Sequence, residues 1–189
     1  MDKLYVDTVR LMLEVAPEVF ASDRFALKGG TALNFFVQDM PRLSVDIDVV
    51  FVPHQLPRET ALAEISKELA VIQARLQSRG IKAEIASSKT GDETKILARR
   101  DRIEVKVEIN YVFRGTLLPV ETRPLTKAAS DLFTTALSVP TLAVAELYGS
   151  KLVVALDRQH PTVRPLLHVR TLRPASRVRG VICRLHCRP

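Results

Sequence analysis

The 189-residue sequence contains only two cysteines, no long apolar run and no acidic residue near its C-terminus. Two cysteines are too few for a disulfide framework, and no second pair is present to complete a zinc site. No apolar run reaches the ~20 residues of a membrane span, and the N-terminus lacks the basic-then-apolar order of a signal peptide. The composition, 47% apolar and 26% charged, is that of an ordinary globular domain. We therefore expect one domain, located in the cytoplasm and outside the membrane.

The net charge of +7 belongs to the C-terminal tail, residues 162–189. This tail contains seven arginines and no Asp or Glu, which leaves 21 basic and 21 acidic residues in residues 1–161. Cys183, His186 and Cys187 could ligate a metal ion, but a disordered basic tail with incidental cysteines is the simpler interpretation. We therefore expect a folded domain at residues 1–161 and a separate basic tail.

Hydrophobic periodicity predicts a few helices around a small mixed sheet. Apolar residues at helical spacing mark residues 4–15, 32–37 and 58–78, and a further helix opens at Thr141 and runs to about Asp157. Alternating or β-branched patterns mark strands at residues 25–28, 45–52, 81–85, 94–98 and 103–111. The predicted fold class is α+β, or mixed α/β.

The first candidate for chemistry is Gly29-Gly30-Thr31, between a predicted strand and a predicted helix. Glycines allow the backbone to approach a phosphate, and the first amides of a helix present the positive end of its dipole. A plain glycine turn is the alternative, and for a Gly-Gly pair alone it would be preferred.

The second candidate is Asp46-Ile47-Asp48, inside an apolar strand. Residues two apart on a strand project from the same face, so both carboxylates point one way while Ile47 points into the core. Two neighbouring carboxylates repel each other unless a cation lies between them, and Mg²⁺ prefers oxygen ligands of this kind. The alternative is an edge strand with solvated acids.

The two candidates together resemble a known family. Residues 27–33 read LKGGTAL, residues 42–48 read RLSVDID, and Lys151-Leu152 is followed by Arg158. This pattern resembles the AbiEii/AbiGii toxin family, the nucleotidyltransferase-like toxins of type IV toxin–antitoxin systems, over about residues 20–161. The resemblance implies a nucleotidyltransferase-like fold that takes a nucleoside triphosphate and Mg²⁺ or Mn²⁺.

The resemblance also implies a role for each matching residue. Asp46 and Asp48 would hold the metal. Glu108, on the strand at 103–111, would complete the acid set, since three acids can hold two metal ions; Glu104 shares its strand face and is the substitute. Lys151 would offset charge on the leaving pyrophosphate. The residues implied in nucleotide binding are Lys28, Gly29, Gly30, Thr31, Ser44 and Arg158. For Glu108, Lys151 and Arg158, solvated surface charges are the alternative.

Beyond Pro161 the sequence departs from the family pattern. The family places Arg-Asp-Leu here, whereas this chain reads Arg164-Pro165-Leu166. One shifted base in codons for Arg-Pro-Leu yields Asp-Leu, so an out-of-frame tail and a truncated C-terminal helical part are our hypothesis. A genuine basic RNA-binding extension is the rival. Truncation would expose a face that helices normally cover, through which the chain could self-associate.

The function expected from these residues is transfer of a nucleoside monophosphate from a triphosphate to an acceptor hydroxyl. The resemblance implies an RNA acceptor such as tRNA and a cognate antitoxin protein as partner. Two alternatives stay open: an inactive nucleotide- or antitoxin-binding module, and an RNA-binding protein that acts through its basic tail.

Overall fold

The computed structural model describes residues 3–42, 44–87, 93–110 and 114–157, and within these ranges the chain forms five helices and seven strands. Arg158 and the basic tail lie outside the described residues. The helices are α1 (Lys3–Val19), α2 (Gly29–Phe36), α3 (Arg58–Ser78), α4 (Lys127–Phe133) and α5 (Val144–Asp157). The strands are β1 (Phe25–Lys28), β2 (Asp46–Phe51), β3 (Lys82–Ser87), β4 (Glu93–Arg100), β5 (Ile103–Asn110), β6 (Glu121–Pro124) and β7 (Ser138–Thr141).

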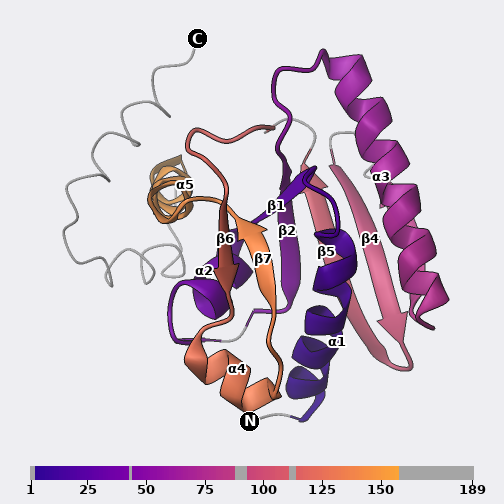
Figure 1. Cartoon of the computed structure of the whole chain (residues 1–189), viewed down its shortest axis with the longest axis vertical. Coiled ribbons are helices and arrows are strands. Elements are labelled where there is room, and N and C mark those ends of the chain that lie inside the picture. Colours follow the sequence, from indigo (N-terminus) through magenta and orange to yellow (C-terminus); the bar gives the residue numbers. More distant parts are fainter. Residues whose placement is uncertain (1–2, 43, 88–92, 111–113, 158–189) are drawn as a thin grey trace.

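The strands form one mixed sheet in the order β3-β4-β5-β2-β1-β7-β6 (Figure 1). The β2–β5 and β1–β7 pairs are parallel, and the other four pairs are antiparallel. The strands that carry the candidate residues, β1, β2 and β5, are therefore adjacent at the centre of the sheet. This arrangement confirms the predicted mixed α/β class.

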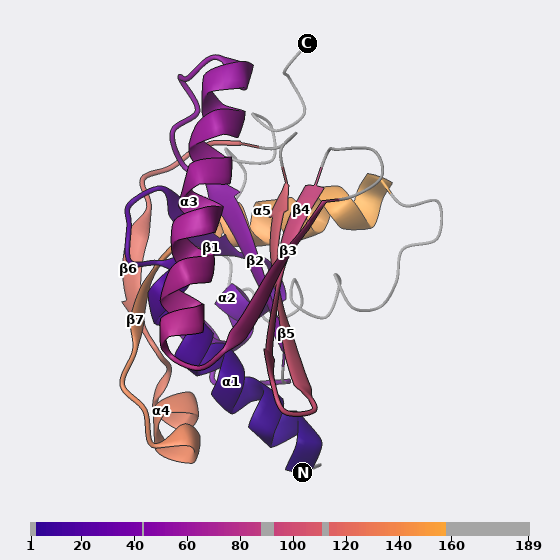
Figure 2. The ribbon, with the colours of Figure 1, turned by 90° about the vertical axis from the view of Figure 1, so that its right-hand side faces the viewer.

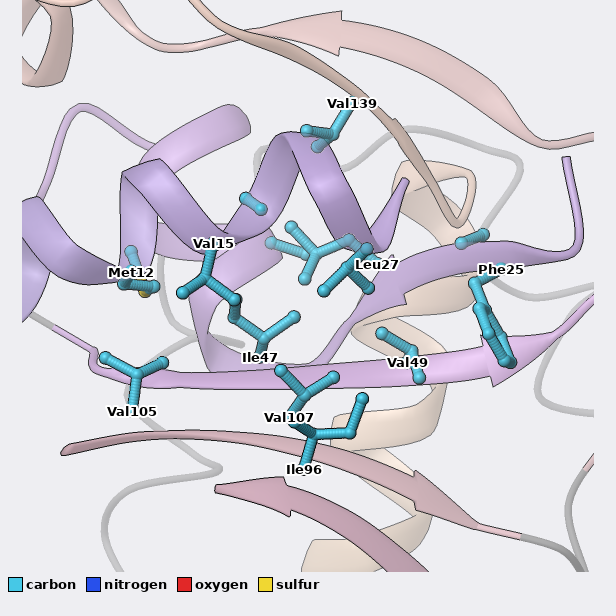
Figure 3. Close-up of a cluster of buried hydrophobic side chains, with 14 of the residues drawn as sticks. Met12, Val15, Phe25, Leu27, Ile47, Val49, Ile96, Val105, Val107 and Val139 are labelled. Carbon is cyan, nitrogen blue, oxygen red and sulfur yellow. The ribbon is translucent and has the colours of Figure 1, made fainter. Parts of the chain in front are cut away.

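The helices cover the sheet unequally. Helix α1 packs against β2 and β5, and α3 packs against β3 and β4. Figure 2 shows these two helices on one side of the central strands and α5 on the other. Met12 and Val15 of α1 lie over Ile47 of β2 in the buried apolar cluster of Figure 3. Because side chains alternate along a strand, Asp46 and Asp48 project from the opposite face, the one on which α5 lies.

The predicted elements agree with the structure where the hydrophobic pattern is strong. Residues 58–78 form α3 as predicted, and the strands of the sheet's centre lie within two residues of their expected positions. The helix at the N-terminus extends beyond the predicted residues 4–15 to Val19 and contains Pro17 in its last turn. Elements β6, α4 and β7 were not predicted. Thr141, which was expected to open a helix, is the last residue of β7, and α5 begins at Val144. No helix among the described residues is long and apolar enough to cross a membrane.

Candidate functional site

The glycine turn lies in direct contact with the acid pair. Strand β1 ends at Lys28, and Gly29 begins α2 with a positive φ of 77°. A β-carbon at Gly29 would lie 2.1 Å from Oδ2 of Asp48, far inside van der Waals contact. Both the backbone conformation and the proximity of the carboxylate therefore require glycine at this position.

The next two residues of the turn connect it to the segment before β2. A β-carbon at Gly30 would lie 3.4 Å from Oγ of Ser44 and 3.9 Å from Nη2 of Arg42. The Thr31 hydroxyl donates to the Asp46 carbonyl oxygen at 2.5 Å and lies 2.9 Å from Oγ of Ser44. The motif RLSVDID thus folds back over the turn that the motif LKGGTAL forms.

The position of Thr31 changes the role expected for it. Its side chain is 2% exposed and its hydroxyl proton is used by the Asp46 carbonyl oxygen. The family resemblance implies nucleotide binding by Thr31, but in this geometry its hydroxyl fixes the start of β2 against α2. Only the backbone amide of Thr31 is left for a ligand.

The central strands place charged residues in one row across the sheet. In the strand register, Lys28 of β1 lies opposite Asp48 of β2, Asp48 lies opposite Glu108 of β5, and Glu108 lies opposite Lys95 of β4. Residues opposite each other project from the same face. The row therefore reads cation, acid, acid, cation.

The electrostatics of Asp48 show which other charges surround it. Burial raises the pKa of its carboxyl group, and the negative charges of Glu108 and Asp46 raise it further. The positive charges of Lys28 and Lys151 act in the opposite direction. The structure therefore brings five predicted residues to one place, including Lys151 from α5, more than one hundred residues away in the sequence.

The two candidate third acids have different surroundings. Glu108 lies opposite Asp48 and accepts a hydrogen bond from Nζ of Lys95 at 2.8 Å. Glu104 lies opposite Arg99 and accepts from its Nε at 2.6 Å. The geometry therefore places Glu108, and not its substitute Glu104, beside the acid pair.

Lys95 was not identified from the sequence. The alternation of β4 could have found it, because a hairpin between two strands of known register places Lys95 directly opposite Glu108. The turn of this hairpin is Asp101-Arg102, whereas residues 88–92, between β3 and β4, and 111–113, after β5, lie outside the described residues. Without the register, a lysine on the polar side of an amphipathic strand carries no distinguishing signal.

The carboxylates of Asp46 and Asp48 fit a metal ion whose remaining coordination positions are filled by a bound substrate and water. No group of three or more His, Cys, Asp or Glu side chains within the described ranges lies close enough to hold a metal ion. Mg²⁺ is commonly bound through one or two carboxylates, with substrate phosphates and water filling the other positions. Asp46 and Asp48 supply those two carboxylates, and the repulsion at Asp48 is the kind that a cation relieves.

A further acid, Glu146 in the first turn of α5, was missed by sequence reasoning. It is 7% exposed, and its carboxylate accepts hydrogen bonds from the backbone amides of Leu117 and Leu118 at 3.1–3.2 Å. Burial raises its pKa, and the two amide hydrogen bonds partly offset this. Glu146 therefore ties the segment before β6 to the helix that carries Lys151.

Comparison with known proteins is consistent with this geometry. A family model described as nucleotidyl transferase AbiEii toxin, type IV TA system, matches residues 10–166. Among solved structures, MenT4, a nucleotidyltransferase toxin from Mycobacterium tuberculosis H37Rv, is similar with a TM-score of 0.52 and 20% identity. The similarity covers 79% of this chain and 51% of that chain, so this chain spans about half the length of MenT4. No curated protein sequence matches.

Proposed function

We propose a reaction for this chain on the premise that it belongs to the AbiEii nucleotidyltransferase toxin family of type IV toxin–antitoxin systems, as it does. The proposed reaction is transfer of a nucleoside monophosphate from a nucleoside triphosphate to a hydroxyl group of RNA. The observation that carries the proposal is the contact between the Gly29 turn and the carboxylate of Asp48, with Lys28 and Lys151 acting on the same carboxylate. The glycine turn, the acid pair and the two lysines thus lie close together, which supports the proposal.

The triphosphate end of the site is formed by α2 and α5. The backbone amides of Gly29 and Gly30 lie at the N-terminus of α2, where the helix dipole favours a phosphate group. The half-buried Lys28 and Lys151 would offset charge on the β- and γ-phosphates. Ser44 would hold the turn in place, because its hydroxyl donates to the Thr31 hydroxyl oxygen, whose own proton goes to the Asp46 carbonyl oxygen. We assign Arg158 a supporting role here from the family resemblance alone.

The acid end of the site would hold the metal. Asp46 and Asp48 would bind Mg²⁺ or Mn²⁺, which when bound stabilises negative charge on the α-phosphate during transfer. The acceptor hydroxyl oxygen forms a bond to the α-phosphorus as the bond from that phosphorus to the α–β bridging oxygen breaks. Pyrophosphate leaves, and Glu108 is the group that we assign to accept the hydroxyl proton.

The partners follow from the same premise. A type IV toxin has a cognate antitoxin protein, and we propose that one is the partner of this chain in the cytoplasm. An RNA acceptor, tRNA in particular, stays a proposal. So does self-association of the chain.

Label transfer tests the proposal. The full chain is incubated with total RNA, Mg²⁺ and each of the four triphosphates labelled at the α-phosphate. We expect one or more of them to label RNA, and Asp48→Asn to abolish labelling while Glu104→Gln retains it, because Glu104 lies away from Asp48. Nucleotide binding without labelling would instead indicate a binding module without turnover.

A further inference from the structure

The third acid of the site already has a cation beside it. Glu108 and Lys95 form an ion pair at 2.8 Å between opposite positions of β5 and β4, and both side chains are about one-third exposed. The positive charges of Lys28 and Lys151 act on Asp48 in the same row. Lys106 lies opposite Asp46 in the strand register. Three carboxylates thus lie beside four ammonium groups before any metal ion binds.

This charge balance differs from the two-metal expectation. Two divalent cations require the third acid as a shared or additional ligand. Here one oxygen of Glu108 is engaged by Lys95, and no three acids of the described chain lie in metal-binding range. A second cation would have to displace Lys95 or bind beside its positive charge, and either costs free energy.

We propose that this site takes a single divalent cation, at Asp46 and Asp48, and that the ammonium group of Lys95 occupies the place of a second one beside Glu108. The inference rests on the proposed function. Lys95 acts through Glu108 and is therefore a positioning residue: it holds one carboxylate oxygen and leaves the other for the acceptor hydroxyl. The positive charge that a second metal ion would supply on the acceptor side comes from the protein.

Counting bound Mn²⁺ tests this inference without measuring activity. The full chain is titrated with Mn²⁺ alone, and free Mn²⁺ is followed by electron paramagnetic resonance. We expect one site in the wild-type protein, lost in Asp48→Asn. Lys95→Met frees Glu108, so a second Mn²⁺ should bind about tenfold more tightly than any second ion in the wild type. Lys95→Met combined with Glu108→Gln should remove that gain.

The chain contains a matched control for this experiment. Arg99 and Glu104 form an ion pair of the same kind between the same two strands, at 2.6 Å, but away from Asp48. Arg99→Met should leave the Mn²⁺ count at one. Both side chains are partly exposed and outside the apolar core, so loss of folding is not expected from either substitution.

Each outcome has a definite meaning. Two Mn²⁺ ions in the wild-type protein, or no gain in Lys95→Met, would overturn the single-cation inference and leave the proposed function intact. If the wild-type protein bound no Mn²⁺, or bound it as tightly as Asp48→Asn does, both the single-cation inference and the proposed function would be overturned. One ion in the wild type and two in Lys95→Met would support the inference even if the RNA acceptor remained unidentified.

Discussion

Substitution of Gly29 by alanine should damage both the fold and the site, for two separable reasons. The residue has a φ of 77°, in the left-handed region where an L side chain costs about 1–2 kcal/mol. Its β-carbon would also lie 2.1 Å from Oδ2 of Asp48, and relief of such an overlap typically costs about 1–3 kcal/mol. We expect Gly29→Ala to lower the free energy of unfolding by about 2–5 kcal/mol.

A second glycine separates these two contributions. Gly80 follows α3 with a φ of 73°, and nothing lies within 4 Å of a β-carbon built there. Gly80→Ala should therefore show only the conformational cost, about 1–2 kcal/mol. The difference between the two variants measures the overlap with Asp48. Asp48→Ala should recover part of that difference when combined with Gly29→Ala, because it removes the Oδ2 and Cγ atoms that collide.

Urea denaturation measures the unfolding free energies of the wild type, the three single variants and the double variant, and calorimetry with a triphosphate and Mg²⁺ measures nucleotide binding. If Gly29→Ala and Gly80→Ala destabilised the protein equally, and Asp48→Ala recovered nothing, the contact between the turn and the carboxylate would be refuted. Nucleotide binding should fall in Gly29→Ala and be unchanged in Gly80→Ala.

Three further predictions concern buried polar groups. Glu146→Ala should lower the free energy of unfolding by about 2–4 kcal/mol in urea denaturation, because the amides of Leu117 and Leu118 lose their acceptor; a loss below that of a surface substitution would contradict this. Thr31→Val should cost about 1–2 kcal/mol in the same assay, because the Asp46 carbonyl oxygen loses its donor. Burial raises the pKa of Asp48 above 3.8, so the folded chain retains the proton to higher pH than the unfolded chain does. In the presence of a chelator, the free energy of unfolding should therefore fall as pH rises from the unfolded-state pKa of Asp48 to its higher folded-state pKa. Asp48→Asn should remove this dependence.

The centre of the fold could be predicted from the sequence because local pattern and tertiary environment agree there. Residues of α3 repeat at helical spacing, and Asp46 and Asp48 interrupt an otherwise apolar strand. The segment from 114 to 141 was not predictable in this way. Its strands β6 and β7 are four residues each, and both contain proline. Such short strands are specified by pairing with β1 and with each other, which leaves little local pattern.

The candidate site likewise has a part that could be predicted from the sequence and a part that could not. The glycine turn and the acid pair belong to two motifs that follow each other closely along the chain, so their proximity in space could be predicted from the sequence. The partners of Glu108 and Glu104 depend on the register of β4 against β5, which one sequence does not specify. Glu146 was missed because a carboxylate in the first turn of a helix is ordinary, and only the structure shows the amides that it accepts from.

The most direct test of the central claim follows the two ends of the triphosphate. Wild-type protein, RNA and Mg²⁺ are incubated with a triphosphate labelled at the α-phosphate, and separately with one labelled at the γ-phosphate. Nucleotidyl transfer at Asp46 and Asp48 predicts that the α label enters RNA, that the γ label appears in pyrophosphate, and that Asp48→Asn or a chelator abolishes both. Label from the γ-phosphate in RNA, or α labelling that persists in Asp48→Asn, would contradict the account.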